Sequence, residues 1–363
     1  MKNTQSHIIT LTKSCGIILM VLAHSMPPES LLWRIIYSFH MPLFFIMSGY
    51  CFKTDYLLDT KKFIYRKLKG IYLPMVLFSL PILLLHNVFC YAYIYEPTWI
   101  YTWKDFAWNI LRVVTRMSHN EGMLGTFWFL KDLFVGNLIF YFAYKWINKT
   151  KLNNKYHLPV IVLILLFISE LCSMFHLRVP YFGISDKSFN AAFFIAFGYL
   201  WKQKGWKTNN WFIWGIGIVS ICIKLHVIPE TTFQGTSYIT FLGFAIPALF
   251  GSMILWDICR LMYKYLPQMI ITFFEKIGHK TLWIMALHFL SFKLVSYMYI
   301  LLYELPIINL VDFPVLSICI HSPIMWLMYT AIGVFIPLVC ANFFLVCKEL
   351  IYHFYNSKIL YKL

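Results

Sequence analysis

Long runs without a charged residue constrain this chain more than any other feature. Three of them contain no Asp, Glu, Lys or Arg: Ile71–Tyr95, Thr231–Trp256 and Phe313–Cys347. Each is longer than the roughly 20 residues that a helix needs to cross about 30 Å of hydrocarbon. Only 13% of the 363 residues are charged, about half the usual share in soluble proteins. The chain is therefore expected to be a membrane protein.

The apolar runs are continuous rather than alternating, which favours helices over the strands of a β-barrel. We predict an all-α fold, a polytopic transmembrane helical bundle with about ten spans. The predicted spans are Ile8–Met26, Ile35–Phe52, Ile71–Tyr95, Met123–Tyr144, Leu158–His176, Ser188–Trp201, Trp211–Ile223, Ser237–Trp256, Thr281–Tyr303 and Ser322–Cys347. The connections are too short for a soluble domain, so residues 1–363 are expected to form a single membrane-embedded domain.

The basic excess indicates orientation rather than nucleic-acid binding. The chain has 31 Lys and Arg against 15 Asp and Glu. If the N-terminus is cytoplasmic and ten spans alternate, most of the basic residues fall on the cytoplasmic side, as the positive-inside rule expects. We therefore predict cytoplasmic termini, a multi-pass protein of the cytoplasmic (inner) membrane, and membrane lipids rather than nucleic acid as partners. The nine scattered cysteines suggest neither a disulfide framework nor a metal site.

Lys13 and His24 lie within the first apolar segment, where ionisable side chains are costly and usually functional. They are eleven residues apart. On a helix this spacing puts both within about 20° of one face and about 16 Å apart along the axis. A long, thin molecule that entered from the cytoplasm would pass Lys13 before it reached His24.

Five segments carry a family likeness: KSCGIILMVLAHSM, YSFHMPLFFIMSGYCFK, YRKLKGIYLPM, GTFWFLKDLF and IGHKTLWIMALHFL, in that order. Together they resemble acyltransferase family 3, the integral membrane acyltransferases, and especially its branch of fucose 4-O-acetylases and exopolysaccharide O-acetyltransferases. The resemblance covers about residues 10 to 345. It implies transfer of an acyl group, usually acetyl, from acetyl-CoA or another acyl-CoA to a hydroxyl of a cell-surface polysaccharide or lipid-linked glycan. Acyl-CoA would be a co-substrate, with no permanently bound cofactor.

The resemblance also assigns the donor side. The family's signature histidine falls on His24 and its preceding basic residue on Lys13. Its cytoplasmic Arg-x-x-Arg motif falls on Arg66 and Lys69, where the lysine lacks the fork that grips a phosphate bidentately. Lys13, Arg66 and Lys69 are thus the expected donor-binding residues, and the thin pantetheine arm of coenzyme A fits the route from Lys13 to His24. Arg66 and Lys69 form a basic cluster together with Lys61, Lys62 and Lys67. The alternative role of this cluster is orientation of the chain in the membrane and binding of anionic lipid.

His24 is the expected catalytic residue. A sugar hydroxyl is a poor nucleophile at neutral pH and needs a base, and the reference pKa of histidine, about 6.5, suits that task. Direct transfer and a covalent acyl-histidine intermediate are both open. The alternative is a histidine that only hydrogen-bonds a neighbouring helix.

His40 and His288 are candidates for acceptor binding or for orienting the catalytic group. His40 precedes Pro42, which frees a backbone carbonyl that can line a cavity, although a packing role is the alternative. His288 falls in the family's late pattern with Gly278 and Thr281.

Lys131 and Asp132 are further candidates for the same two roles, because intramembrane charges usually face a polar cavity. Structural ion pairing is the alternative. Ser48 and Gly49 are expected to permit a close approach of helices.

Two other classes of function compete with the acyltransferase. Ten spans with internal charges also suit a transporter or flippase for a glycan or another metabolite. A transporter, however, has no need of the Lys13–His24 pair or of a cytoplasmic basic motif. The third possibility is a non-catalytic membrane subunit of a polysaccharide export complex.

Overall fold

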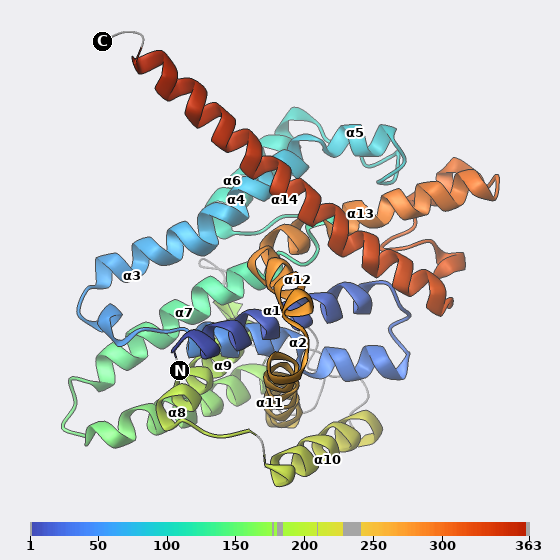
Figure 1. Cartoon of the computed structure of the whole chain (residues 1–363). Coiled ribbons are helices and arrows are strands. Elements are labelled where there is room, and N and C mark those ends of the chain that lie inside the picture. The colour runs from blue at the N-terminus through green and yellow to red at the C-terminus, as the bar shows by residue number, and fades with distance from the viewer. Residues whose placement is uncertain (1, 176–177, 180–183, 209, 228–240, 361–363) are drawn as a thin grey trace.

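A computed structural model describes residues 2–175, 178–179, 184–208, 210–227 and 241–360, and in these residues the chain is almost entirely helical (Figure 1). The α-helices are α1 (Lys2–His24), α2 (Leu31–Tyr50), α3 (Thr60–Lys67), α4 (Leu73–Leu84), α5 (His86–Tyr91), α6 (Trp103–Arg116), α7 (Trp128–Ile147), α8 (Asn154–Met174), α9 (Asp186–Lys204), α10 (Trp211–Val227), α11 (Phe241–Tyr265), α12 (Gln268–His279), α13 (Thr281–Leu302) and α14 (Pro323–Leu360). Short helical turns are η1 (Thr54–Leu57), η2 (Leu68–Tyr72), η3 (Gly122–Leu124), η4 (Ile307–Val311) and η5 (Ser317–Cys319), and two-residue strands β1 (Arg178–Val179) and β2 (Ile184–Ser185) pair antiparallel.

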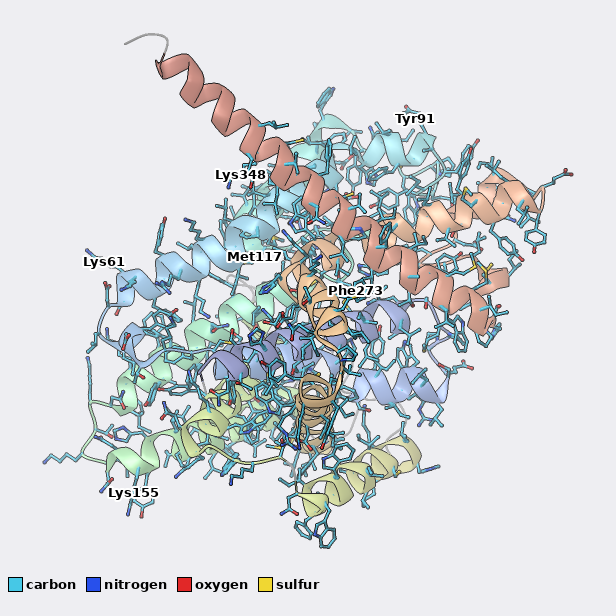
Figure 2. All side chains as sticks on the ribbon, in the orientation of Figure 1. Lys61, Tyr91, Met117, Lys155, Phe273 and Lys348 are labelled. Atoms are coloured by element: carbon cyan, nitrogen blue, oxygen red, sulfur yellow. The ribbon has the colours of Figure 1, made fainter. Side chains whose placement is uncertain are left out.

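The helices confirm the predicted all-α, polytopic class. Every predicted span overlaps a helix, although residue 176 of the fifth span and residues 237–240 of the eighth lie outside the described part of the chain. Among described residues, seven runs are long and apolar enough to cross a membrane: Thr4–His24, Leu31–Tyr50, Thr60–Leu84, Asn154–Met174, Phe241–Tyr265, Thr281–Leu302 and Pro323–Leu350. The number of spans and the side of each terminus stay predictions. Lys61 and Lys155, both expected to be cytoplasmic, lie on the same side of the view in Figure 2, opposite Tyr91.

The basic cluster, which precedes the third predicted span, lies on one helical path formed by α3 and η2. Asp59 caps α3, because its carboxylate accepts a hydrogen bond from the backbone N–H of Lys62 at 2.9 Å. The helical path then continues through α3, η2 and α4 to Leu84. The turn η2 is π-helical, a rare conformation that is frequent at functional sites.

The linker between residues 96 and 122 contains the helix α6. Thr102 and Asp105 form a capping box at its start, which satisfies backbone N–H groups that a helix would otherwise leave unpaired. Val113 is buried, whereas Trp103 is 89% exposed, and α6 packs against α4. The linker therefore forms an amphipathic helix on the flank of the bundle.

The middle of the bundle is built around α1 and α2 (Figure 1). α1 packs against α2, α11, α12, α13 and α14, and α2 packs against α9. A Cβ atom on Gly49 would lie 1.9 Å from the carbonyl oxygen of Ile195, and one on Gly198 would lie 2.0 Å from that of Ile46. The predicted close approach at Gly49 is thus confirmed, and glycines on both helices permit it.

Candidate active site

His24 ends α1, immediately before a turn that contains Pro27 and Pro28. Its imidazole lies beside two side chains of α13: the ring centroid of Phe289 is 5.0 Å away, edge-on, and that of His288 is 5.4 Å away, stacked. α13 also contacts α1 directly. The sequence therefore brings His24 and His288 together from segments more than 260 residues apart.

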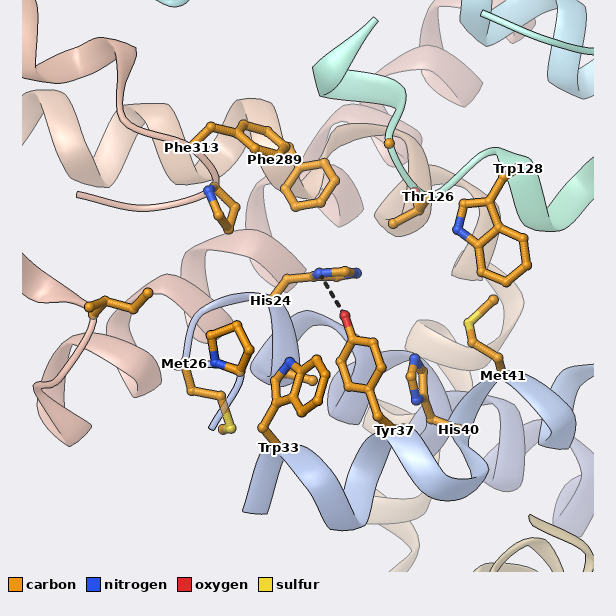
Figure 3. Close-up of a pocket in the computed structure, with 15 residues that line it drawn as sticks. His24, Met26, Trp33, Tyr37, His40, Met41, Thr126, Trp128, Phe289 and Phe313 are labelled. Carbon is orange, nitrogen blue, oxygen red and sulfur yellow. Dashed lines mark hydrogen bonds between the residues drawn. The ribbon is translucent and has the colours of Figure 1, made fainter. Parts of the chain in front are cut away.

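One face of α2 completes the surroundings of His24 (Figure 3). Trp33, Tyr37 and His40 follow one another at helical spacing, with Trp33 stacked on Tyr37 at 3.8 Å and Tyr37 edge-on to His40 at 4.7 Å. The hydroxyl oxygen of Tyr37 lies 3.4 Å from Nδ1 of His24. The other ring nitrogen of His24 faces the side of Thr126 and Trp128 in Figure 3. Tyr37 therefore orients His24 with one nitrogen towards open space.

The two neighbouring histidines are held in a defined tautomer by backbone carbonyls. Nδ1 of His40 lies 2.9 Å from the carbonyl oxygen of Ile36, and Nδ1 of His288 lies 3.0 Å from that of Ile284. A carbonyl oxygen only accepts, so both Nδ1 atoms carry a hydrogen, and in the neutral imidazole both Nε2 atoms keep a lone pair. Nε2 of His288 is buried and has no hydrogen-bond partner among the described residues.

His24, Tyr37 and His40 line a cavity of about 390 Å³, here named the His24 cavity. His288 stacks on His24 but is not among the residues that line this cavity. Its wall comes from α1, α2, α7 and α13, from the segment at Thr126 and from the loop that carries Phe313. The wall is mainly aromatic and aliphatic, and its polar groups are few: His24, Tyr37, His40 and Thr126 are among them. Such a pocket excludes water while a small number of polar groups orient a ligand.

A second cavity of about 410 Å³, the Lys13 cavity, lies further towards the start of α1. It is lined by Lys13, Cys51, Lys67 and Thr281, together with mainly apolar side chains. Met41 belongs to the wall of both cavities. Lys13 and His24, predicted to share a face of one helix, thus line two adjoining cavities.

Arg66 and Lys69 do not line either of these cavities. Both side chains are exposed. Arg66 donates a hydrogen bond to the hydroxyl of Tyr56 at 3.0 Å, and Tyr56 lines the Lys13 cavity. The lysine between them, Lys67, lines that cavity directly. Lys67 is therefore the member of the basic cluster that lines the Lys13 cavity, and the sequence did not single it out as a donor-binding residue.

Lys131 and Asp132 also lie outside the two cavities. Asp132 is buried and accepts a hydrogen bond from the Ser188 hydroxyl at 2.7 Å, at the contact of α7 with α9. Gly278 of the late pattern packs against α1, because a Cβ atom there would lie 2.3 Å from the carbonyl oxygen of Thr10. Asp132 and Gly278 therefore have evident packing roles, whereas Thr281 lines the Lys13 cavity.

The sequence did not single out four residues that line the His24 cavity: Trp33, Tyr37, Phe289 and Phe313. A signal existed for two of them, because Trp33, Tyr37 and His40 are spaced by four and three residues and so share a helix face. No comparable signal marked Phe313, which reaches the cavity from a loop.

Comparison with known families agrees with this architecture. Residues 7–346, nearly the whole chain, match the family model of an acyltransferase domain. Together with the long apolar helices, this match defines a multi-pass membrane acyltransferase. The chain belongs to acyltransferase family 3, which confirms the resemblance at the level of the family, while the branch stays a prediction. No curated protein and no solved structure matches the chain.

Proposed function

We propose that this acyltransferase works in the cytoplasmic membrane and transfers an acyl group, acetyl by expectation, from cytoplasmic acyl-CoA to a hydroxyl of a cell-surface polysaccharide or lipid-linked glycan. His24 is the general base. One observation carries the proposal: the His24 imidazole, held by the Tyr37 hydroxyl at 3.4 Å, faces a cavity that adjoins the Lys13 cavity at Met41.

The hydrogen bond to Tyr37 supports the role of a base. If Nδ1–H of His24 donates to the Tyr37 oxygen, Nε2 keeps its lone pair on the side of Thr126 and Trp128. Nε2 then accepts the proton of the sugar hydroxyl as that oxygen attacks the thioester carbonyl. The new C–O ester bond forms, the C–S bond breaks, and the coenzyme A thiolate leaves and takes up a proton.

The Lys13 cavity supports binding of the donor. Its apolar walls suit a thin, weakly polar pantetheine arm, and the ammonium groups of Lys13 and Lys67 suit phosphates. Arg66, hydrogen-bonded to Tyr56 on the cavity wall, and Lys69 add positive charge on the same helical path. Donor and acceptor would then approach His24 from opposite ends of the bundle.

Transfer of radiolabelled acetyl from acetyl-CoA tests the proposal. Membranes of a deletion strain, complemented with full-length protein, are incubated with the label, and the polysaccharide fraction is counted. His24→Gln is expected to be inactive, whereas His279→Gln, a change at an exposed histidine of α12, retains activity. A His24→Gln protein with turnover near wild type, at matched protein level, contradicts the role of His24. Absence of label transfer by the wild type contradicts the acetyl-CoA donor.

The order of the two substrates distinguishes direct transfer from an acyl-histidine intermediate. A covalent intermediate predicts ping-pong kinetics and an acylated protein in the absence of acceptor. Direct transfer predicts that both substrates bind before either product leaves.

A further inference from the structure

A third cavity, of about 420 Å³, lies beside the His24 cavity. We name it the His86 cavity. Its wall comes from α5, from the segment after it that contains Tyr95, Trp99 and Tyr101, from Glu121 before α7, and from Phe313. None of the residues with an expected catalytic or donor role lines it.

A buried pair, His86 and Glu121, forms the polar part of this wall. Nδ1 of His86 lies 2.9 Å from Oε2 of Glu121, and Nε2 lies 2.7 Å from the carbonyl oxygen of Trp99. Nε2 therefore carries a hydrogen, and one further proton is shared between Nδ1 and the carboxyl group. Whichever atom holds that proton, the pair has no net charge.

Ring stacking and hydrogen bonds hold the His86–Glu121 pair and its neighbours in place. The Tyr101 ring stacks on His86 with centroids 3.5 Å apart, and the side chain of Asn87 pairs with the backbone of Tyr101 at 2.8 and 2.9 Å. The side chain of Glu121 is fully buried, and its Oε1 accepts no hydrogen bond of standard geometry among the described residues. The hydroxyls of Tyr95 and Tyr101 lie close to this carboxyl group. Because a carboxyl oxygen accepts more than one hydrogen bond, a ligand hydroxyl would share Oε1 with them.

The tyrosines remain hydrogen-bonding groups at any physiological pH. Burial, and then the nearby Glu121 carboxyl group, raise the pKa of Tyr101, which lies outside the predicted spans. The hydroxyls of Tyr95 and Tyr101 both lie near the Glu121 carboxyl group. The cavity therefore offers neutral hydroxyls, a neutral ion pair and aromatic faces.

This composition selects one class of ligand. Among the described residues that line the cavity, none is Lys or Arg, so a phosphate or another anion finds no counter-charge. Trp99 is 63% exposed and offers an open aromatic face, while Glu96 and Asn120 add polar groups at the wall. Flat apolar faces combined with a few planar hydrogen-bonding groups suit a pyranose ring, which has apolar faces and an equatorial belt of hydroxyls.

The position of the cavity relates it to the acceptor. Phe313 forms part of the wall of both the His86 cavity and the His24 cavity. Glu121 and Gly122 line the first, and Gly125 and Thr126, a few residues further along, line the second. A sugar chain that passed Phe313 would occupy both.

We propose that the His86 cavity binds a sugar residue of the acceptor glycan next to the residue whose hydroxyl faces His24. This inference rests on the proposed acyl transfer to a glycan. The enzyme then recognises at least two neighbouring sugars.

Acceptor kinetics test the subsite. The probes are oligosaccharides released by partial hydrolysis of the deletion strain's own surface polysaccharide. Trp99→Ala is expected to raise the apparent KM for these oligosaccharides about tenfold, equivalent to about 1.4 kcal/mol. The kcat at saturating acceptor and the KM for acetyl-CoA stay unchanged. Trp103→Ala is the matched control, because Trp103 is also exposed but lies on α6, outside the cavity.

Binding without turnover separates this inference from the proposed function. Saturation-transfer NMR is recorded with the same oligosaccharides and full-length His24→Gln protein in nanodiscs. In this background, Trp99→Ala is expected to weaken the sugar signal at an oligosaccharide concentration near the wild-type KM, and Trp103→Ala to preserve it. Glu121→Gln is expected to weaken it, and if that variant is not monodisperse, Trp99→Ala alone decides.

An unchanged acceptor KM together with an unchanged NMR signal in Trp99→Ala overturns the subsite, while His24 keeps its role. A fully active His24→Gln enzyme overturns the proposed function instead. The two failures are therefore distinguishable.

Discussion

Lys293 donates a hydrogen bond to the backbone carbonyl of Asp312 at 2.6 Å and so holds the loop that carries Phe313. The same ammonium group donates to the carbonyls of Leu310 at 2.7 Å and Val311 at 3.4 Å. It also lies 5.8 Å from the centroid of the Phe313 ring. Because Phe313 lines both the His24 and His86 cavities, Lys293 is a positioning residue for their shared wall.

Lys293→Met is expected to loosen this wall. Removal of the cation leaves buried carbonyls without their donor, which costs about 1–3 kcal/mol. We expect a lower Tm and a rise in the acceptor KM, with the KM for acyl-CoA unchanged. Lys276→Met, a change at an exposed lysine of α12, is the control. Thermal unfolding combined with transfer kinetics checks this, and equal Tm and KM values in the two variants would refute it.

The contact between α2 and α9 gives a prediction about folding. A Cβ atom on Gly198 would lie 2.0 Å from a backbone oxygen, so one of the two helices must move. Gly198→Ala is expected to destabilise the protein by about 1–3 kcal/mol or more. Gly215→Ala, on α10, meets no atom within 4 Å and is expected to leave the Tm unchanged. Similar yields and Tm values for both variants in detergent would contradict the packing argument.

Affinity for the acyl-CoA donor is expected to depend on which lysine lines the Lys13 cavity, and not on which lysine matches the Arg-x-x-Arg motif. Lys67 lines the Lys13 cavity, whereas Lys69 is exposed and its ammonium lies 6.0 Å from the Tyr65 ring centroid. A lost charge-assisted phosphate contact costs about 1.5–3 kcal/mol. Lys67→Met is therefore expected to raise the KM for acetyl-CoA by an order of magnitude or more, with a smaller effect of Lys69→Met. The ranking is wrong if Lys69→Met has the larger effect on donor binding by calorimetry.

His119, which lies between α6 and η3, is expected to make the folded protein less stable at acidic pH. Burial, and then the Arg112 charge, lower the pKa of His119 to about 4. The unfolded chain, with a pKa of about 6.5, binds the proton more readily. This contribution to stability is thus complete above about pH 6.5 and is lost as the pH falls towards 4. His119→Phe should flatten the fall in Tm between pH 7 and about pH 4.5, and parallel curves would exclude His119 as the cause.

Apolar length was sufficient to predict the helices, because a segment that must satisfy its backbone in lipid has few alternatives to a helix. Boundaries were less predictable. The predicted span Ser322–Cys347 agrees with the start of α14 at Pro323, but the predicted span Ile71–Tyr95 lies on a helical run from Thr60 to Leu84. The uncharged residues 313–322 form a loop that contains the turn η5. That loop conformation brings Phe313 to the cavities, and no periodicity in the sequence encodes it.

The site was predictable where its members share one helix. Lys13 and His24 on α1, and His40 on α2, could be identified from spacing and from the family likeness. The neighbours that come from other helices depend on packing between α1, α2 and α13. The position of Lys67 on the wall of the Lys13 cavity likewise depends on how the helical path packs against the bundle, which the motif does not reveal.

The hydrogen bond between Tyr37 and His24 gives the sharpest test of the mechanism. His24→Gln keeps polarity and size but cannot accept the hydroxyl proton, so turnover should fall by roughly 10² to 10⁴, the range of a positioned acid–base group. Tyr37→Phe removes only the orienting bond, worth about 1 kcal/mol, so kcat should fall roughly fivefold. If the two residues act as a unit, Tyr37→Phe has no further effect in a His24→Gln background. Both variants should bind acetyl-CoA as the wild type does, measured by calorimetry on monodisperse protein. A loss in Tyr37→Phe that equals the loss in His24→Gln would instead make the tyrosine the reacting group.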